Sequence, residues 1–216
     1  MTMCLSFRST GSRKAFNLVE LMLVMSVMSV LLLMSLPAIT NTLRSSYLNA
    51  SGLSLLNNLG LARQTAISRN LPVEVRLYKL PEPGAAFTAN ADTWWAYQLF
   101  LVEGSGNTPL TPVEFMQKSV VISPAKEKSA LLGDLSNASS THREMTPGDS
   151  DLRVGPYNKN YRYVAFRLDP NGAANLTSDN NFITLLLKND KTLEQGGNYF
   201  TVQIDPINGT ARSFRP

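Results

Sequence analysis

A single carboxylate, Glu20, stands at the start of a long apolar segment. The basic residues Arg13 and Lys14 precede it, and the sixteen residues from Leu21 to Leu36 are all Leu, Met, Val or Ser. A lone carboxylate beside a membrane-length apolar segment is costly unless a group of opposite charge meets it. The chemistry that this position predicts is therefore ion pairing in an apolar environment.

The apolar run is too short to cross a bilayer alone. At a rise of about 1.5 Å per residue it covers about 24 Å, against a hydrocarbon core of about 30 Å. Extending the helix back to Phe16 gives about 31 Å and places Glu20 in or beside the hydrocarbon. The Leu and Val residues favour insertion by about 3 to 5 kcal/mol in sum, whereas a central carboxylate costs about 2.5 to 3.5 kcal/mol. We therefore expect Glu20 to need a positive partner.

Two simpler interpretations of this segment exist. A secretory signal peptide would also have a positive start and an apolar middle, but residues 36–38, Leu-Pro-Ala, make a poor small-residue cleavage site. A plain membrane anchor would explain the length and would leave Glu20 without a role.

The start of the chain resembles the type IV filament family, which comprises the type IV pilins and the pseudopilins of type II secretion. The prepilin signature of that family is a basic leader, a small residue, Phe, two or three mostly apolar residues and Glu, followed by a long apolar helix. The matching residues are Arg13-Lys14-Ala15-Phe16-Asn17-Leu18-Val19-Glu20. The resemblance implies that prepilin peptidase cuts between Ala15 and Phe16 on the cytoplasmic side and that the new amine of Phe16 is methylated. Ala15 stands where the family nearly always has Gly.

The resemblance also implies a location and partners. The chain would span the inner membrane once, in contact with membrane lipid, with its C-terminal domain in the periplasm or outside the cell. It would assemble with other pilin or pseudopilin subunits on an inner-membrane assembly platform. The new amine of Phe16 would then pair with Glu20 of a neighbouring subunit inside an apolar bundle. Glu20 also lies in the first turn of the new helix and complements its dipole, so a monomer that satisfies its own carboxylate is the simpler alternative.

Composition fits one membrane helix and one globular domain. The chain has 216 residues, of which 44% are apolar and 17% charged, and this is not a disordered composition. Residues 1–15 hold three basic groups and no acidic one, so the processed chain would have 17 basic against 16 acidic side chains. Cys4, the one cysteine, is in this leader, so the processed chain would hold no disulfide.

We predict four segments: a cleaved leader 1–15, a membrane and assembly helix 16–38, an amphipathic helix 39–71, and a β-rich globular domain 72–216. Pro37 is expected to end or kink the apolar helix.

The amphipathic helix is predicted from one apolar stripe. Its members recur at steps of three, four or seven residues: Leu48, Leu55, Leu59, Ala62 and Ala66. Gly52, Ala62 and Ala66 are small enough for a sheet to approach closely. Asn70-Leu71-Pro72 is the predicted stop.

From Val73 the period changes to two. Val73, Val75 and Leu77 alternate with Glu74, Arg76 and Tyr78, which is typical of a half-buried strand. Further strands are predicted at about 95–102, 113–122, 161–168, 182–188 and 199–204, with a last one near 211–214. The predicted fold class is α+β and pilin-like, with a long N-terminal helix packed on an antiparallel sheet.

Two of these strands end in similar turns, Asp-Pro-Asn-Gly at 169–172 and Asp-Pro-Ile-Asn-Gly at 205–209. Pro presets φ and Gly accepts positive φ, so both are predicted to be hairpin ends. Together with the helix stripe at 59–67, these units resemble the GspH/FimT-like branch, the minor pseudopilins and minor pilins. That resemblance covers the chain in outline and rests on a helix motif and two turns.

Residues 123–160 are rich in Ser, Thr, Asn, Gly, Pro and charge, and only Leu131-Leu132 interrupts them with an apolar pair. We predict a long surface loop there, either as an insertion that presents a contact surface or as an excursion without a partner.

The sequence predicts neither an enzyme nor a cofactor or metal site. His142, the one histidine, lies in the predicted loop, far from any nucleophile pattern. No His/Cys cluster has zinc spacing, and no glycine-rich phosphate loop follows a strand. Asp179-Asn180-Asn181 could offer oxygens to calcium, as loops of some major pseudopilins do, although a solvated turn is the simpler interpretation.

The C-terminal tail is the candidate for nucleic-acid contact. Arg212 and Arg215 flank Phe214, and such groups can bind phosphate and stack a base. Some FimT-like minor pilins bind DNA through a Gly/Arg tail, but here no Arg follows Gly209 directly. An edge strand with solvated arginines is the simpler interpretation.

Two functions follow from these patterns. The first is a structural minor subunit of a type II secretion pseudopilus or a type IV pilus, assembled through its apolar helix. The alternative is a membrane-anchored binding module, for example a DNA-binding minor pilin for DNA uptake.

Overall fold

The computed structural model describes residues 17–81, 92–104, 106–117, 119–133, 145–148, 153–154, 157, 161–188 and 197–215. The chain divides into two compact units, Met1–Thr42 and Leu43–Pro216. The described helices are α1 (Leu18–Arg69) and α2 (Ala130–Gly133). The described strands are β1 (Val73–Pro81), β2 (Asp92–Glu103), β3 (Gly106–Pro109), β4 (Glu114–Phe115), β5 (Val120–Ile122), β6 (Arg162–Leu168), β7 (Phe182–Leu187), β8 (Tyr199–Ile204) and β9 (Ala211–Phe214).

α1 runs for 52 residues and includes Pro37. Of the two alternatives predicted at Pro37, an end of the helix is therefore wrong, and a kink stays a prediction. Proline removes one helical hydrogen bond, a loss that the Leu- and Met-rich run before it offsets through its high helix propensity.

α1 ends where Asn70-Leu71-Pro72 predicts. Asn70 takes a positive φ of 52°. The Asn70 N–H donates to the Ile67 carbonyl at 3.4 Å, and the Leu71 N–H donates to the Ala66 carbonyl at 3.3 Å. These two bonds form a Schellman motif with Asn70 in the left-handed position.

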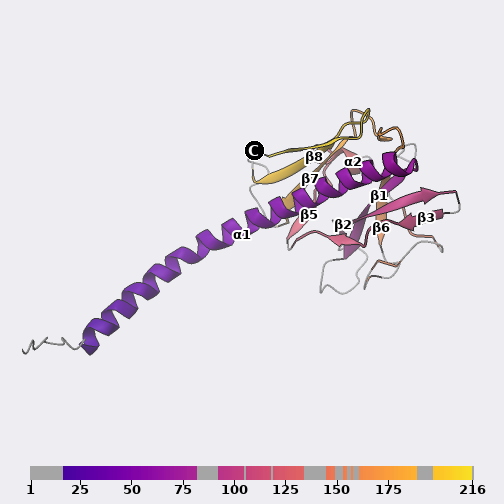
Figure 1. Cartoon of the computed structure of the whole chain (residues 1–216). Coiled ribbons are helices and arrows are strands. Elements are labelled where there is room, and N and C mark those ends of the chain that lie inside the picture. The colour runs from indigo at the N-terminus through magenta and orange to yellow at the C-terminus, as the bar shows by residue number, and fades with distance from the viewer. Residues whose placement is uncertain are drawn as a thin grey trace, which may run out of the picture. The chain divides into compact units, whose positions relative to one another are not determined.

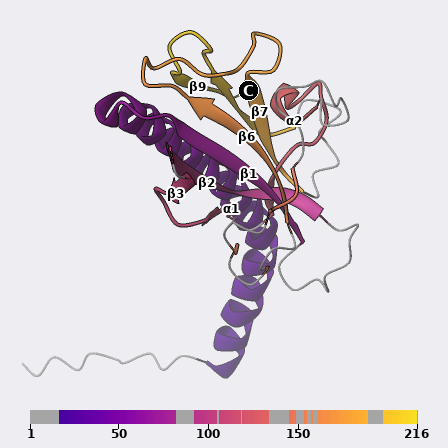
Figure 2. The same cartoon turned by 90° about the vertical axis from the view of Figure 1, so that its right-hand side faces the viewer.

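The strands form one antiparallel sheet in the order β6-β1-β2-β5-β7-β8-β9. Figure 1 labels these strands except β9, which is labelled in Figure 2. β3, β4 and β5 pair in turn along the same side of β2, and a single residue pair, Trp94 with Ile122, links β2 to β5. The predicted α+β class, a long N-terminal helix followed by an antiparallel sheet, is confirmed.

Two details of the strand prediction are wrong. The single strand expected at 113–122 is divided into β4 and β5, because Ser119 adopts a positive φ of 68° that an extended strand cannot contain. β3 was not predicted, because Gly106 to Pro109 lack the apolar alternation of a strand.

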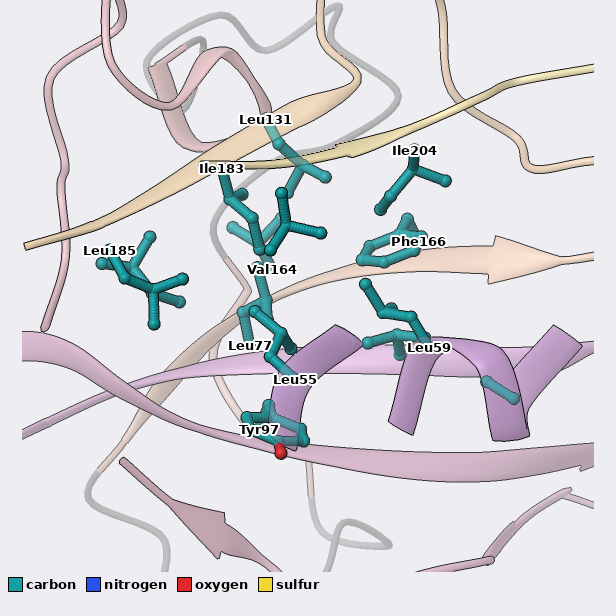
Figure 3. Packing of buried hydrophobic residues seen from close by; sticks show 14 of the residues in the cluster. Leu55, Leu59, Leu77, Tyr97, Leu131, Val164, Phe166, Ile183, Leu185 and Ile204 are labelled. Atoms are coloured by element: carbon teal, nitrogen blue, oxygen red, sulfur yellow. The ribbon is translucent and has the colours of Figure 1, made fainter. Parts of the chain in front are cut away.

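The apolar stripe of α1 packs on one face of the sheet, as predicted. Its members Leu48, Leu55, Leu59, Ala62 and Ala66 are buried. Figure 2 shows the later part of α1 along the sheet, with β1 and β6 side by side. In the close view, Leu55 and Leu59 of α1 lie among Leu77, Val164 and Phe166 of the strands (Figure 3).

β1 is buried on both of its faces, which corrects the prediction of a half-buried strand. Glu74, Arg76 and Tyr78, expected to face solvent, are only 6%, 5% and 1% exposed. A second apolar cluster covers the face of β1 that carries these three side chains, and it includes Tyr78, Val154, Tyr157, Tyr161 and Tyr163.

Two buried charges are accommodated there because they pair with each other. Arg76 Nε donates to Glu74 Oε1 at 2.7 Å. The guanidinium of Arg76 lies over the rings of Phe100 and Tyr163, at 4.3 and 4.6 Å from their centroids. Arg167 adds a second ion pair to Glu74 at 3.0 Å. Burial of charges is tolerated when they are paired in this way.

Residues 123–160 are not only a surface loop. Leu131 and Leu132, at the centre of α2, are buried in the main core. Val154 and Tyr157 belong to the second cluster. The polar composition conceals these few apolar anchors, which hold the described parts of the segment against the sheet.

Both predicted turns reverse the chain. The turn at 205–209 joins β8 to β9, which are neighbours in the sheet. The turn at 169–172 has Gly172 donating to the Asp169 carbonyl at 2.8 Å. The returning segment pairs briefly with the end of β6, through the antiparallel bridge between Leu168 and Ala174 and the bond from the Asn175 N–H to the Arg167 carbonyl at 3.0 Å. This second hairpin is short, because the next strand, β7, lies elsewhere in the sheet.

Candidate functional site

Glu20 lies in the first turn of α1 and is exposed. Asn17, just before the helix, accepts a hydrogen bond from the Val19 N–H on its side-chain oxygen at 3.4 Å. Its carbonyl accepts the first helical bond, from the Leu21 N–H at 3.2 Å. Asn17 and Glu20 therefore occupy the N-cap and N3 positions, where side-chain oxygens stabilise a helix start.

Sequence reasoning missed the role of Asn17. The signal was available, since an Asn-x-x-Glu spacing directly before an apolar run is a variant of the capping box. Within the described residues, no group makes an ion pair or hydrogen bond with the Glu20 carboxylate. Its negative charge complements the partial positive charge of the helix start, but no cation neutralises it within the described part of the chain.

Every large apolar side chain described between Leu18 and Met34 is exposed, with exposures from 42% to 73%. The two serines in this stretch do not interrupt the apolar surface, because their hydroxyls bond inside the helix. Ser26 Oγ donates to the Leu23 carbonyl and Ser29 Oγ to the Met25 carbonyl, both at 2.8 Å. The cylinder thus offers apolar surface on all sides, and a surface of this kind is usually covered by lipid or by another protein.

No helix among the described residues has enough length and apolar character to cross a membrane. The predicted cleavage position, Ala15 and Phe16, lies outside the described residues, and so does His142.

Two of the three residues that could offer oxygens to calcium, Asp179 and Asn180, bond within a local turn, whereas Asn181 Oδ1 is buried and has no hydrogen-bond partner among the described residues. Thr177 donates to Asn180 Oδ1 from its N–H at 2.8 Å and from its hydroxyl at 2.9 Å. Ser178 Oγ donates to Asp179 Oδ1 at 3.3 Å. The described residues contain no group of three His, Cys, Asp or Glu side chains placed to hold a metal.

The two arginines of the tail face opposite sides of the sheet. Arg212 pairs across the strands with Gln203, and it is exposed. Arg215 instead donates from Nη2 to Ser45 Oγ of α1 at 2.8 Å and to Asn198 Oδ1, just before β8, at 3.1 Å. The structure therefore does not bring Arg212 and Arg215 together in one phosphate-binding site.

The helix motif and the two turns do meet. Arg63 Nε donates to the Asn208 carbonyl at 2.6 Å. A Cβ added at Gly172 would lie 3.4 Å from Ile67 Cδ1, and Gly209 packs against the Gly172 carbonyl. The three segments that carry the second resemblance thus form one contact at the C-terminal end of α1.

No protein-family model matches the chain. No curated protein matches it either. Among solved structures, the fold is similar to the minor pseudopilin EpsH of the Vibrio cholerae type 2 secretion system, with 10% identity over 78% of this chain and 97% of that chain and a TM-score of 0.44. A second EpsH structure gives 14% identity, 80% and 96% coverage and a TM-score of 0.43.

The type IV minor pilin FimU of Pseudomonas aeruginosa is also similar, with 13% identity, 78% and 92% coverage and a TM-score of 0.35. Likenesses this weak assign no function to the chain.

Proposed function

We propose that this chain is a structural minor subunit of a type IV filament system, either a type II secretion pseudopilus or a type IV pilus. The observation that carries the proposal is the first part of α1, where exposed apolar side chains surround the helix and Glu20 lacks a described partner. An apolar helix with one unneutralised carboxylate gains stability where other apolar helices and one positive group surround it.

Processing follows from the prepilin signature. Prepilin peptidase cuts between Ala15 and Phe16, and the new amine of Phe16 is then methylated. Residues 16–38 hold the chain in the inner membrane until an assembly platform adds it to the filament. The proposed span includes Phe16, which lies outside the described residues. The domain that begins with the amphipathic part of α1 faces the periplasm or the exterior.

Glu20 carries the assembly step in this proposal. In the filament, the carboxylate pairs with the Phe16 amine of a neighbouring subunit, and both charges are withdrawn from water together. A carboxylate at a helix start is also compatible with the helix dipole, so Glu20 stabilises the helix and the contact between subunits at once.

The test is Glu20→Gln in cells that contain the filament machinery. We expect the variant to reach the membrane fraction at the normal level. Its incorporation into filaments should fall by about tenfold or more, because loss of one partner of a buried ion pair costs about 3 to 5 kcal/mol. Glu127→Gln, which removes an exposed carboxylate of the strand domain, is the matched control and should assemble normally.

Two outcomes would contradict this proposal. Normal incorporation of the Glu20→Gln variant would contradict the proposed pairing of Glu20 with the Phe16 amine of a neighbouring subunit. A mature chain that begins anywhere except Phe16, measured by mass spectrometry of the purified protein, would remove the processing step.

The second candidate is a membrane-anchored module that binds DNA. Exposed Arg212 beside exposed Phe214 on one face of β9 is the observation that favours it. Since Arg215 is held by α1, DNA retention by the full chain should depend on Arg212 more than on Arg215. Equal loss on Arg212→Ala and Arg215→Ala would contradict this assignment of roles.

A further inference from the structure

We propose that the outer edge of β9, Ala211–Phe214, binds an extended acidic segment of a partner protein as an additional strand of the sheet. This inference concerns the strand domain and stands independently of helix assembly. It rests on the backbone groups of the edge, on the contacts that hold β9 in place, and on the side chains that β9 displays.

The two edges of the sheet differ. At β6, the Tyr163 N–H and carbonyl exchange hydrogen bonds with Met145 at 3.0 and 2.8 Å, so a neighbouring segment already covers that edge. β9 pairs with β8 on one side. No described residue pairs with β9 on its other side. An uncovered strand edge is a template for pairing with another chain.

The register shows which backbone groups the edge presents. Arg212 pairs with Gln203, and the hydrogen bond from the Asp205 N–H to the Thr210 carbonyl, 2.9 Å long, sets the alternation. In an antiparallel pair, every second residue directs its N–H and C=O to the neighbouring strand. Arg212 therefore bonds toward β8, while Ala211 and Ser213 direct their N–H and C=O groups outward. These outward groups are the ones that an added strand would bind.

β9 is held firmly at both ends. Before the strand, Asp205 Oδ1 accepts from the Ile207 N–H at 2.9 Å and Asp205 Oδ2 accepts from Asn208 Nδ2 at 2.8 Å. After the strand, Arg215 binds Ser45 and Asn198. An edge that is already ordered loses little conformational entropy when a strand is added, and this favours binding.

The exposed face of β9 defines the chemistry of the partner. Arg212 and Phe214 lie two residues apart on that face, and Phe214 is 51% exposed. Arg212 makes no hydrogen bond or ion pair with any described residue. It lines a hollow of about 230 Å³ together with Gln203 and Asp205. Both carboxylate oxygens of Asp205 accept bonds from the turn, and Asp205 makes no ion pair with Arg212.

The added strand should therefore carry a carboxylate opposite Arg212 and an apolar side chain two positions away, opposite Phe214. Cross-strand pairs of opposite charge and of apolar groups stabilise adjacent strands. A second copy of β9 offers Arg212 no carboxylate. The register that pairs Ser213 with Ser213 places Phe214 opposite Arg212, and the register that pairs Ala211 with Ser213 places Arg212 opposite Arg212. Like charges in that position are destabilising. The structure thus favours an acidic partner over self-pairing.

The probe is the peptide acetyl-Thr-Asp-Thr-Leu-Thr-Asp-Thr-amide. Its Asp and Leu residues share one face, and its symmetry allows parallel or antiparallel addition in the required register. It is titrated at low salt into the full chain in mild detergent, and binding is followed by NMR and by amide hydrogen exchange. We expect exchange of the Ala211 and Ser213 amides to slow by several-fold, since these N–H groups become hydrogen-bonded.

Two variants separate backbone pairing from simple charge attraction. Ser213→Pro removes one outward N–H, and proline is tolerated on edge strands at such a position, so peptide affinity should fall by about tenfold or more. Arg212→Gln should weaken binding by about two- to fivefold, the range of a cross-strand charge pair. Arg69→Gln removes an exposed charge from α1, outside β9, and should leave the affinity unchanged.

Several outcomes would overturn the proposal. Unchanged exchange at Ala211 and Ser213 with saturating peptide would exclude strand addition. Equal binding of a peptide with Asn in place of Asp would exclude the acidic preference. Protection without peptide that rises with protein concentration would identify a second copy as the occupant. Tighter binding of single-stranded DNA, without protection of these amides, would identify nucleic acid instead.

Discussion

Tyr97 joins the sheet to α1 through a buried hydroxyl. Its Oη lies 3.0 Å from Ser54 Oγ and accepts a hydrogen bond from Asn58 Nδ2, also at 3.0 Å. Both partners are polar residues of α1 that directly precede the stripe residues Leu55 and Leu59. Burial raises the pKa of the Tyr97 phenol above its usual value, and the hydrogen bonds to Ser54 and Asn58 offset only part of that rise. The neutral phenol is therefore the form that this contact requires.

Tyr97→Phe tests that requirement. At pH 7 the variant should lose about 1 to 2 kcal/mol of unfolding free energy, because two partners lose a hydrogen bond in a region with little water. Urea unfolding followed by the fluorescence of Trp94 and Trp95, on the same strand, measures this loss.

The pH dependence of that variant has a defined sign. The folded-state pKa of Tyr97 is raised, so the unfolded chain releases its proton first as pH rises through about 10. The native protein should therefore lose stability above about pH 10, and Tyr97→Phe should lose less. Tyr47→Phe is the control, since the Tyr47 hydroxyl has no hydrogen-bond partner among the described residues. An equal alkaline loss in wild type and Tyr97→Phe would contradict this account.

At the scale of the element, alternation and helical spacing predicted most of the fold. The stripe from Leu48 to Ala66, the helix stop at Asn70 and the β8–β9 turn all depend on local preferences, and the structure confirms them. Double burial of β1 depends on contacts between distant segments. Glu74 and Arg76 are charged yet buried, and the rings of Phe100 and Tyr163 cover the Arg76 guanidinium. The sequence near β1 does not indicate that distant residues will cover this face.

The candidate sites also divide into features that local sequence predicts and features that depend on contacts between distant segments. Period-two alternation already places Arg212 and Phe214 on one face and Arg215 on the other, so their separation could have been predicted from the strand. Asn17 could also have been identified, since its spacing to Glu20 is local. The position of β9 at an edge, unpaired on one side among the described residues, could not, because the order of strands in a sheet is set by long-range pairing.

Gly52 of α1 lies directly against Phe200 of β8. A Cβ at this position would overlap the Phe200 ring, with Cγ at 2.5 Å. We expect Gly52→Ala to lower the free energy of unfolding by about 1 to 3 kcal/mol through overpacking. Urea unfolding of the full chain provides the measurement.

Gly60 provides a matched control on the same helix. A Cβ there would meet no atom within 4 Å, so Gly60→Ala should raise stability by about 0.5 to 1 kcal/mol through helix propensity alone. Adding Phe200→Leu to Gly52→Ala should cost less than the sum of the two single changes, since the smaller side chain makes room for the new methyl group. Equal effects of alanine at Gly52 and Gly60 would contradict the close contact.

At the scale of the whole molecule, the two compact units differ in what they bury. All the residues of the main core and of the second cluster lie after Leu43, the first residue of the second unit. In the first unit, the large apolar side chains described from Leu18 to Met34 are exposed. Stability of the strand domain should therefore depend little on residues 1–42, whereas the tendency to associate should depend on them strongly.

Deletion of residues 1–42 separates these two properties. We expect the remaining chain, 43–216, to keep its cooperative urea transition, with an unfolding free energy within about 1 kcal/mol of the full chain, because no core side chain is removed. It should also stay monomeric without detergent, as measured by analytical ultracentrifugation, while the full chain associates. A deleted chain that unfolds without cooperativity would show that the first unit stabilises the domain, and helix burial would then serve folding as well as assembly.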